Sequence, residues 1–229
     1  MTNYEINSKK LLNGIISRFQ FSFGRTLINP KTFIIHNFST FNLQYNVNQY
    51  NNSFSVIVGA NTYVATIAQG FYQSATSLAT AIQTNLNSLG TGLTFVVSVT
   101  TLTGLMTISA GSAFSLVISS DENQRLMGFS KNGNYTANIS YTAPSVVNLV
   151  YSYFFNFKAH QMNVSTIIPI DSVSTSMILY QPRQPLNLLK ESVGKTNYTV
   201  VELTDEWDRP WNFDYYMQIE VSDEFSQKK

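Results

Sequence analysis

The side chains that could carry out catalysis are few, and none falls into a recognisable catalytic spacing. Histidine occurs twice, at His36 and His160, and neither belongs to an H-x-x-x-H or similar spacing that would hold a metal ion. A lone histidine can act as a general acid or base near neutral pH. Because neither has a partner at a suitable spacing, we interpret both as ordinary strand residues.

The densest acidic group is formed by Asp205, Glu206 and Asp208, with Asp214 shortly after it. Paired carboxylates can hydrolyse a glycosidic bond, and clustered carboxylates can bind calcium. These residues lie in one expected turn between two strands, however, and they do not match the D-x-D-x-D-G calcium loop. We therefore interpret the group as a solvated turn.

Nucleophile and nucleotide-binding motifs are missing from the sequence. The chain contains no cysteine, which excludes disulfides, thiolate zinc sites and a cysteine nucleophile. The patterns G-x-S-x-G, G-x-x-x-x-G-K-[ST] and G-x-G-x-x-G do not occur either. The sequence therefore predicts a protein that is not an enzyme, with no cofactor and no bound metal.

Aromatic residues leave open a second class of function, a β-sandwich that binds a glycan or a receptor. Trp207 and Trp211, if exposed, could stack against sugars. Alternate positions of one expected strand are also aromatic, at Tyr151, Tyr153, Phe155 and Phe157. Alternate residues on one face of a strand usually form core, and we interpret this ladder in that way.

The charged fraction of 12% is about half the usual share of a soluble domain. A hydrophobic fraction of 44% argues against disorder, and no apolar run is long enough for a membrane helix. With a net charge of +1 and no basic tract, no direct nucleic-acid binding is expected. The polar start of the chain also gives no expectation of a signal peptide. Ser, Thr, Asn and Gln must then form the solvent face, as in proteins that pack against neighbours.

Short stretches of alternating apolar residues, separated by turn signals, predict a sandwich or barrel. Residues 130–142 read as a polar linker between two groups of strands. The expected strands are 19–23, 32–35, 54–58, 63–67, 95–99, 105–109, 114–118, 149–157, 165–170, 176–180, 198–203 and 216–221.

One helix is expected among these strands, over residues 74–89. Ser74 or Thr76 can cap its start, and Gly90 is placed to end it. Its apolar face consists of Leu78, Ile82, Leu86 and Leu89.

Residues 1–20 are expected to form an N-terminal arm in which apolar residues recur near helical spacing. The arm could dock on a neighbouring subunit, or it could be a terminal helix that covers its own core. The remainder, residues 21–229, is expected to form one domain with a helix-containing segment at 54–129. The candidate subunit-contact residues of the arm are Leu11, Leu12, Ile15, Ile16 and Phe19.

Two stretches of the sequence carry a family resemblance. The middle stretch contains GFY at 70–72, SATSLATAIQTNLN at 74–87, TGLMTI at 103–108 and MGF at 127–129. The tail stretch, VVELTDEWDRPWNFDYYMQIEV at 200–221, resembles an L-T-D-x-x-G-x-P strand–turn–strand, with Trp-Asp-Arg in place of the usual glycine-containing turn. Their order and spacing resemble those of penton-type and minor capsid proteins of virophages, Polinton-like elements and nucleocytoplasmic large DNA viruses.

The resemblance implies a mostly β protein, a jelly-roll β-sandwich with one inserted α-helix at about 74–89 and an N-terminal arm. It implies a structural role in the virion of an icosahedral double-stranded DNA virus, with assembly inside the host cell. A homopentamer at the fivefold vertex is favoured, and a cement protein that links capsomers is the alternative. The implied partners are further copies of the chain, the major capsid protein and other capsid proteins, and an internal membrane could lie nearby without insertion of the chain.

Overall fold

The computed structural model describes residues 2–7, 14–15, 17–41, 45–133, 135–150, 152–170, 177–182, 187–189, 193–211 and 215–223. The chain forms two compact units. The sandwich unit comprises Met1–Leu43 and Ser152–Lys229, and the inserted unit comprises Gln44–Tyr151. This division differs from the expected single domain over residues 21–229, because each unit encloses a hydrophobic core of its own.

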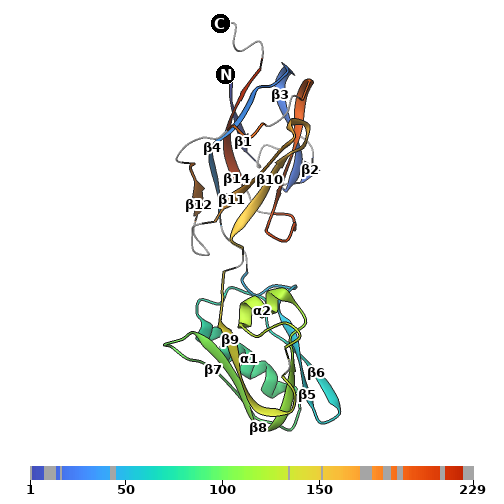
Figure 1. Cartoon of the computed structure of the whole chain (residues 1–229), viewed down its shortest axis with the longest axis vertical. Helices are drawn as coiled ribbons and strands as arrows, with labels where there is room; N and C mark the ends of the chain where they lie inside the picture. Colours follow the sequence, from blue (N-terminus) through green and yellow to red (C-terminus); the bar gives the residue numbers. More distant parts are fainter. Residues whose placement is uncertain are drawn as a thin grey trace. The chain divides into compact units, whose positions relative to one another are not determined.

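The sandwich unit consists of two antiparallel sheets (Figure 1). One sheet has the order β1-β14-β4-β12, and the other has the order β11-β10-β13-β3-β2. The chain crosses repeatedly between the sheets, and apart from the pairs β2 with β3 and β10 with β11, the neighbours in each sheet are distant in sequence, as in a double-sheet jelly roll. The strands are β1 (Thr2–Asn7), β2 (Gly14–Ile15), β3 (Arg18–Ile28), β4 (Thr32–Phe41), β10 (Phe154–Ala159), β11 (Val164–Pro169), β12 (Met177–Tyr180), β13 (Lys195–Thr204) and β14 (Tyr215–Ser222).

The core of the sandwich unit follows from the alternation of apolar residues along its strands. In β14, Met217, Ile219 and Val221 are buried between the sheets, as the sequence predicted. Aromatic rings join the two sheets, with centroid distances of 6.1 Å for Phe33 and Phe157 and 5.7 Å for Phe38 and Phe155. Such ring pairs stabilise a core beyond the area that they bury.

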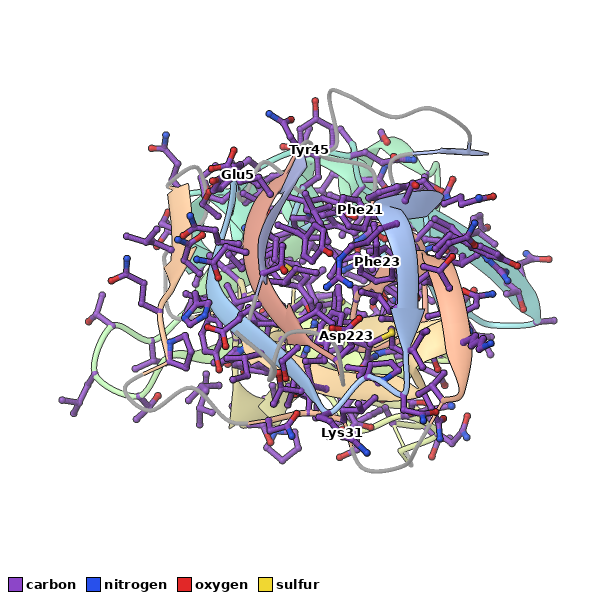
Figure 2. The ribbon with its side chains drawn as sticks, turned by 90° about the horizontal axis from the view of Figure 1, so that it is seen from above. Glu5, Phe21, Phe23, Lys31, Tyr45 and Asp223 are labelled. Atoms are coloured by element: carbon purple, nitrogen blue, oxygen red, sulfur yellow. The ribbon has the colours of Figure 1, made fainter. Side chains whose placement is uncertain are left out.

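One side of this core is occupied by aromatic residues of β3. Phe21 and Phe23 lie on the inner side of β3 in Figure 2. Tyr4 of β1 meets both rings edge to face, at centroid distances of 6.0 Å from Phe21 and 5.3 Å from Phe23. The first strand of the chain therefore contributes directly to the sandwich core.

A β-bulge in β4 changes which residues face the core. Asn37 is paired with Gln218 and Ile35 with Ile219, so His36 is the extra residue of β4. Ile35 and Phe38 are both buried, although they are three positions apart. The alternation of buried and exposed residues breaks after Ile35, and the bulge turns the side chain of Phe38 back toward the core. The expected strand ended at residue 35 because the period-two pattern stops there.

The inserted unit is a sheet of order β6-β5-β8-β7, with β9 also paired to β8. Helix α1 lies against this sheet (Figure 1), and its residues Leu78, Ala79, Ile82 and Leu86 are buried in the core of the unit. The elements are β5 (Ser53–Val58), β6 (Asn61–Thr66), α1 (Ala75–Ser88), β7 (Phe95–Val99), β8 (Leu105–Val117), α2 (Asp121–Met127) and β9 (Asn138–Val146).

Helix α1 matches its sequence prediction closely. Ser74 is the N-cap and forms a capping box with Ser77, and Gly90 follows the helix with φ of +67°. The helix also covers backbone groups at the sheet margins. Asn87 exchanges two hydrogen bonds with the backbone of Phe95, and Asn85 exchanges two with the backbone of Thr66. The two asparagines thereby form hydrogen bonds with backbone N–H and C=O groups of the edge strands β6 and β7, which would otherwise lack a partner in the sheet.

Two expectations for the inserted unit require correction, and one helix was not expected. The strands expected at 105–109 and 114–118 form one strand, β8. The linker expected at 130–142 contains the start of β9, an edge strand that accommodates Pro144. Helix α2 was not expected, because its seven residues are too few for a helical period, although Ser120 caps it and Gly128 ends it with φ of +80°.

The N-terminal arm also requires correction. Thr2–Asn7 is a β-strand that pairs in register with β14, from Thr2 opposite Val221 to Asn7 opposite Tyr216. Ile6 is buried in the sandwich core. The helical interpretation is therefore wrong for Thr2–Asn7, where pairing to β14 determines the conformation.

We predict that Gly128→Ala disrupts the inserted unit. A Cβ atom at this position would lie 2.0 Å from the carbonyl oxygen of Ser145, and the φ of +80° would add backbone strain. We expect a loss of more than about 3 kcal/mol in the free energy of unfolding. Hydrogen exchange of peptides from the inserted unit measures this loss.

The matched control is Gly92→Ala. Gly92 has a similar φ of +76°, but no atom lies within 4 Å of the position of its Cβ. Only the backbone strain of about 1 kcal/mol should remain. Equal effects of the two substitutions would show that the close approach to Ser145 does not matter.

Candidate functional site

The acidic turn between β13 and β14 is built around one buried carboxylate. Asp205 is 1% exposed, and its Oδ1 accepts hydrogen bonds from the backbone N–H groups of Trp207 at 2.9 Å and Arg209 at 3.0 Å. Its Oδ2 accepts a hydrogen bond from Nε of Arg209 at 2.8 Å. Because both oxygens are used inside the turn, Asp205 is not available to a substrate or an ion.

The same turn fixes both tryptophans. The Arg209 guanidinium lies 4.3 Å from the centroid of the Trp207 ring. Trp211 is fully buried and its Nε1 donates to Oγ1 of Thr40 at 3.3 Å. Its ring also packs at 4.2 Å from that of Phe155. The hypothesis of an exposed Trp211 that binds sugars is therefore wrong, because the indole belongs to the sandwich core.

The interpretation of the turn as solvated is correct only in part. The Asp208 side chain is 74% exposed and lies 3.5 Å from Nζ of Lys158, whereas Asp205 is buried. The sequence signal for this difference was present, since an aspartate followed four residues later by arginine can close a turn on itself. Asp214 lies outside the described residues.

Each of the two histidines is paired with a glutamate. Nε2 of His36 lies 3.0 Å from Glu220, and Nε2 of His160 lies 2.6 Å from Glu202. His36 lies in β4 as the extra residue of its bulge, whereas His160 begins a short 3-10 helix at His160–Met162. Within the described residues no cluster of three or more His, Cys, Asp or Glu side chains could hold a metal ion.

Of the aromatic ladder at residues 151–157, only the second half belongs to the core of the sandwich unit. Phe155 and Phe157 are fully buried, as predicted, while Tyr153 is 48% exposed because β10 begins only at Phe154. Tyr151 lies outside the described residues.

The candidate contact residues of the N-terminal segment separate into two groups. Phe19 is 4% exposed and belongs to the sandwich core, so its side chain is not available to a neighbouring subunit. The side chain of Ile15 in β2, and Leu11, Leu12 and Ile16, lie outside what the structure describes.

A second buried carboxylate holds the end of β14. The Asp223 side chain is 0% exposed and accepts a hydrogen bond at 2.7 Å from Nη1 of Arg25, and it lies on the inner side of β3 (Figure 2). The bond to Asp223 raises the pKa of Arg25 above its ordinary value. Burial raises the pKa of Tyr215, and the pKa of Tyr216 is raised by burial and by its hydrogen bond to Glu5. These shifts follow from packing and pairing within the sandwich unit.

The surfaces of the two units differ in charge. The inserted unit contains four charged residues, Asp121, Glu122, Arg125 and Lys131, all in or near α2. Nine of the twelve large apolar side chains that are exposed among the described residues belong to this unit, including Val64 at 58%, Val96 at 54% and Leu102 at 92%. The candidate functional feature of the chain is therefore the uncharged and partly apolar surface of the inserted unit. No described helix is long and apolar enough to cross a membrane.

Comparison with known proteins bears on the fold. No model of a known protein family matches the sequence, and no curated protein sequence matches it. The structure is similar to the crystal structure of the selenomethionine-labelled mavirus penton protein, with a TM-score of 0.52 and 11% sequence identity. The likeness covers 96% of this chain and 98% of that chain. It shows that the fold is of the virophage penton type, and the predicted jelly-roll fold is confirmed.

We predict that Asp205→Asn destabilises the sandwich unit by about 3 kcal/mol, because it leaves the Arg209 guanidinium, whose side chain is 14% exposed, without its counter-charge. Urea unfolding followed by tryptophan fluorescence measures this effect, since Trp207 and Trp211 are the only tryptophans in the chain. Asp208→Asn is the control. Asn tolerates the φ of +59° at this position, and loss of an exposed pair should cost less than about 1 kcal/mol. Similar losses in both variants would contradict the structural role of Asp205.

Proposed function

We propose that the chain is a structural capsid protein of an icosahedral double-stranded DNA virus and that it forms the fivefold vertex as a homopentamer. The supporting observation is the likeness to the mavirus penton protein along nearly the whole length of both chains. That likeness includes the jelly roll and the unit inserted between β4 and β10. The proposal locates the chain in the virion and assigns no catalysis to it.

The architecture suits assembly for a physical reason. The sandwich unit encloses its own core between its two sheets. The outer faces of these sheets therefore remain available for contacts with other proteins. A chain with 12% charged residues meets its neighbours with little desolvation of charge, which would otherwise oppose association. In a cyclic oligomer each copy uses two different faces, and the ring closes when their relative rotation permits it.

The proposed partners are further copies of the chain, the major capsid protein and other capsid proteins. Leu11, Leu12, Ile15 and Ile16 remain proposed subunit-contact residues, whereas Phe19 is withdrawn because it is buried in the core. A cement protein that links capsomers is the alternative position in the same shell.

The oligomeric state of the purified full-length chain tests the vertex proposal. We expect native mass spectrometry to find a species of five times the chain mass of 25.7 kDa. A chain that stays monomeric at all accessible concentrations would contradict the vertex and favour the cement position.

The contact residues of the N-terminal segment can be tested without removal of β1. We expect Leu11→Lys combined with Leu12→Lys to weaken association by about tenfold or more, because two charges would enter an apolar contact. The urea unfolding midpoint of the monomer should not change. Asn3→Lys is the control, since Asn3 is an exposed residue of β1. If association of the Leu11 and Leu12 variant equals that of the control, these residues are not subunit contacts.

A further inference from the structure

The outer face of the inserted sheet carries aliphatic and hydroxyl side chains and no charge. Strand register places Val64 of β6, Ser55 of β5 and Val117 of β8 in one row across this face. The next row consists of Thr62, Ile57 and Ser115. Alternate residues point to opposite faces of a sheet, and the other face is the buried one. We call these six residues, together with Ser53 and Thr66, the valine face.

The valine face is distinct from the core of the inserted unit. Phe54, Val56, Ala65 and Leu116 alternate with its members and are buried in the core beside α1. Val64 is 58% exposed and Val117 is 38% exposed. Two branched aliphatic side chains, on either side of Ser55 in one row, are therefore open to solvent in a single copy of the chain.

Charge determines what this face can bind. A charged partner would lose its hydration against a surface that offers no counter-charge, at a considerable cost. Sugars bind preferentially to aromatic rings, and none of the eight residues of the valine face is aromatic. The partner that this face fits best is therefore a protein surface that is itself uncharged.

The inserted unit is such a surface. Its helix α1 exposes Thr76, Thr80 and Thr84, and the helix contains no charged residue along its 14 positions. A copy of the chain thus has two uncharged surfaces on one unit, the valine face and the exposed side of α1. Two different faces on each copy are what a closed ring requires.

From these observations we propose that the valine face packs against the inserted unit of a second copy of the chain. The inference rests on the proposed assembly function and specifies which part of the chain makes a contact between subunits. It places an interface on the inserted unit in addition to any contact of the sandwich unit.

Lysine substitutions on the full-length chain test the inference. We expect Val64→Lys and Val117→Lys each to weaken self-association by about tenfold or more, because each places a charge in an apolar contact. Leu102→Lys is the matched control: Leu102 is 92% exposed, in the turn before β8 and outside the valine face. Sedimentation equilibrium gives the association constants, and hydrogen exchange of the inserted unit establishes that each variant is folded.

A labelling experiment provides a second readout. Because the chain has no cysteine, Val64→Cys and Leu102→Cys each introduce a single thiol. We expect the thiol at position 64 to react with a maleimide more slowly in the oligomer than in the dilute monomer, and the thiol at position 102 to react equally in both.

The outcomes separate this inference from the proposed function. If the wild-type chain forms a ring that Val64→Lys and Val117→Lys leave intact, and the thiol at position 64 stays reactive, the valine face is not an interface and the vertex proposal stands. If the wild-type chain neither self-associates nor enters capsids, both are overturned. Loss of association in Leu102→Lys as well would indicate a general effect of added charge and would also overturn the assignment of this face.

Discussion

The position of β14 between β1 and β4 is the constraint on which the sandwich unit depends. The last described strand pairs on one side with the first strand of the chain and on the other side with β4, so Ser222 lies opposite Thr32. Neither sheet partner lies near β14 in the sequence, and the entropy of loop closure must be overcome before these contacts form. The bond from Arg25 to the buried carboxylate of Asp223 holds the end of this strand against the other sheet. Strands β1 and β14 are therefore both part of the core of this unit.

This constraint explains how a second unit can be accommodated. β4 ends at Phe41 and β10 begins at Phe154, and both strands belong to the same sandwich, which is complete without the residues between them. The inserted unit has its own core and pairs only with itself among the described strands. Its contacts are more local, since β5 with β6 and β7 with β8 are hairpins. A unit with its own core and local hairpins can fold without altering the pairing of residues between the strands of the sandwich unit.

The sequence predicted those features that depend on neighbouring residues. The hairpin of β5 and β6, helix α1 with its Ser74 cap, and the alternation of β14 follow from periods of two or 3.6 residues. It could not predict the two units, because pairing across the insertion leaves no local pattern. The bulge at His36 interrupted the alternation of β4. The spacing of Asp205 and Arg209 permits the bond that closes the turn, but the burial of Asp205 also depends on the packing of the turn against the sandwich. Local periodicity therefore identified strands, and long-range pairing decided their partners.

The low charge of the chain has a different meaning in each unit. In the sandwich unit, opposite charges lie side by side across strands: Lys158 is opposite Glu202, which is opposite Arg18. Such pairs stabilise a sheet that faces water. The inserted unit lacks this arrangement, and its solvent surface is formed by hydroxyl, amide and aliphatic groups outside the α2 region. A surface needs few charges when it is covered in the functional state, because each buried charge would require a partner. The uneven distribution of charge therefore favours the inserted unit, with its valine face, as the part of the molecule that is adapted to contact with other copies.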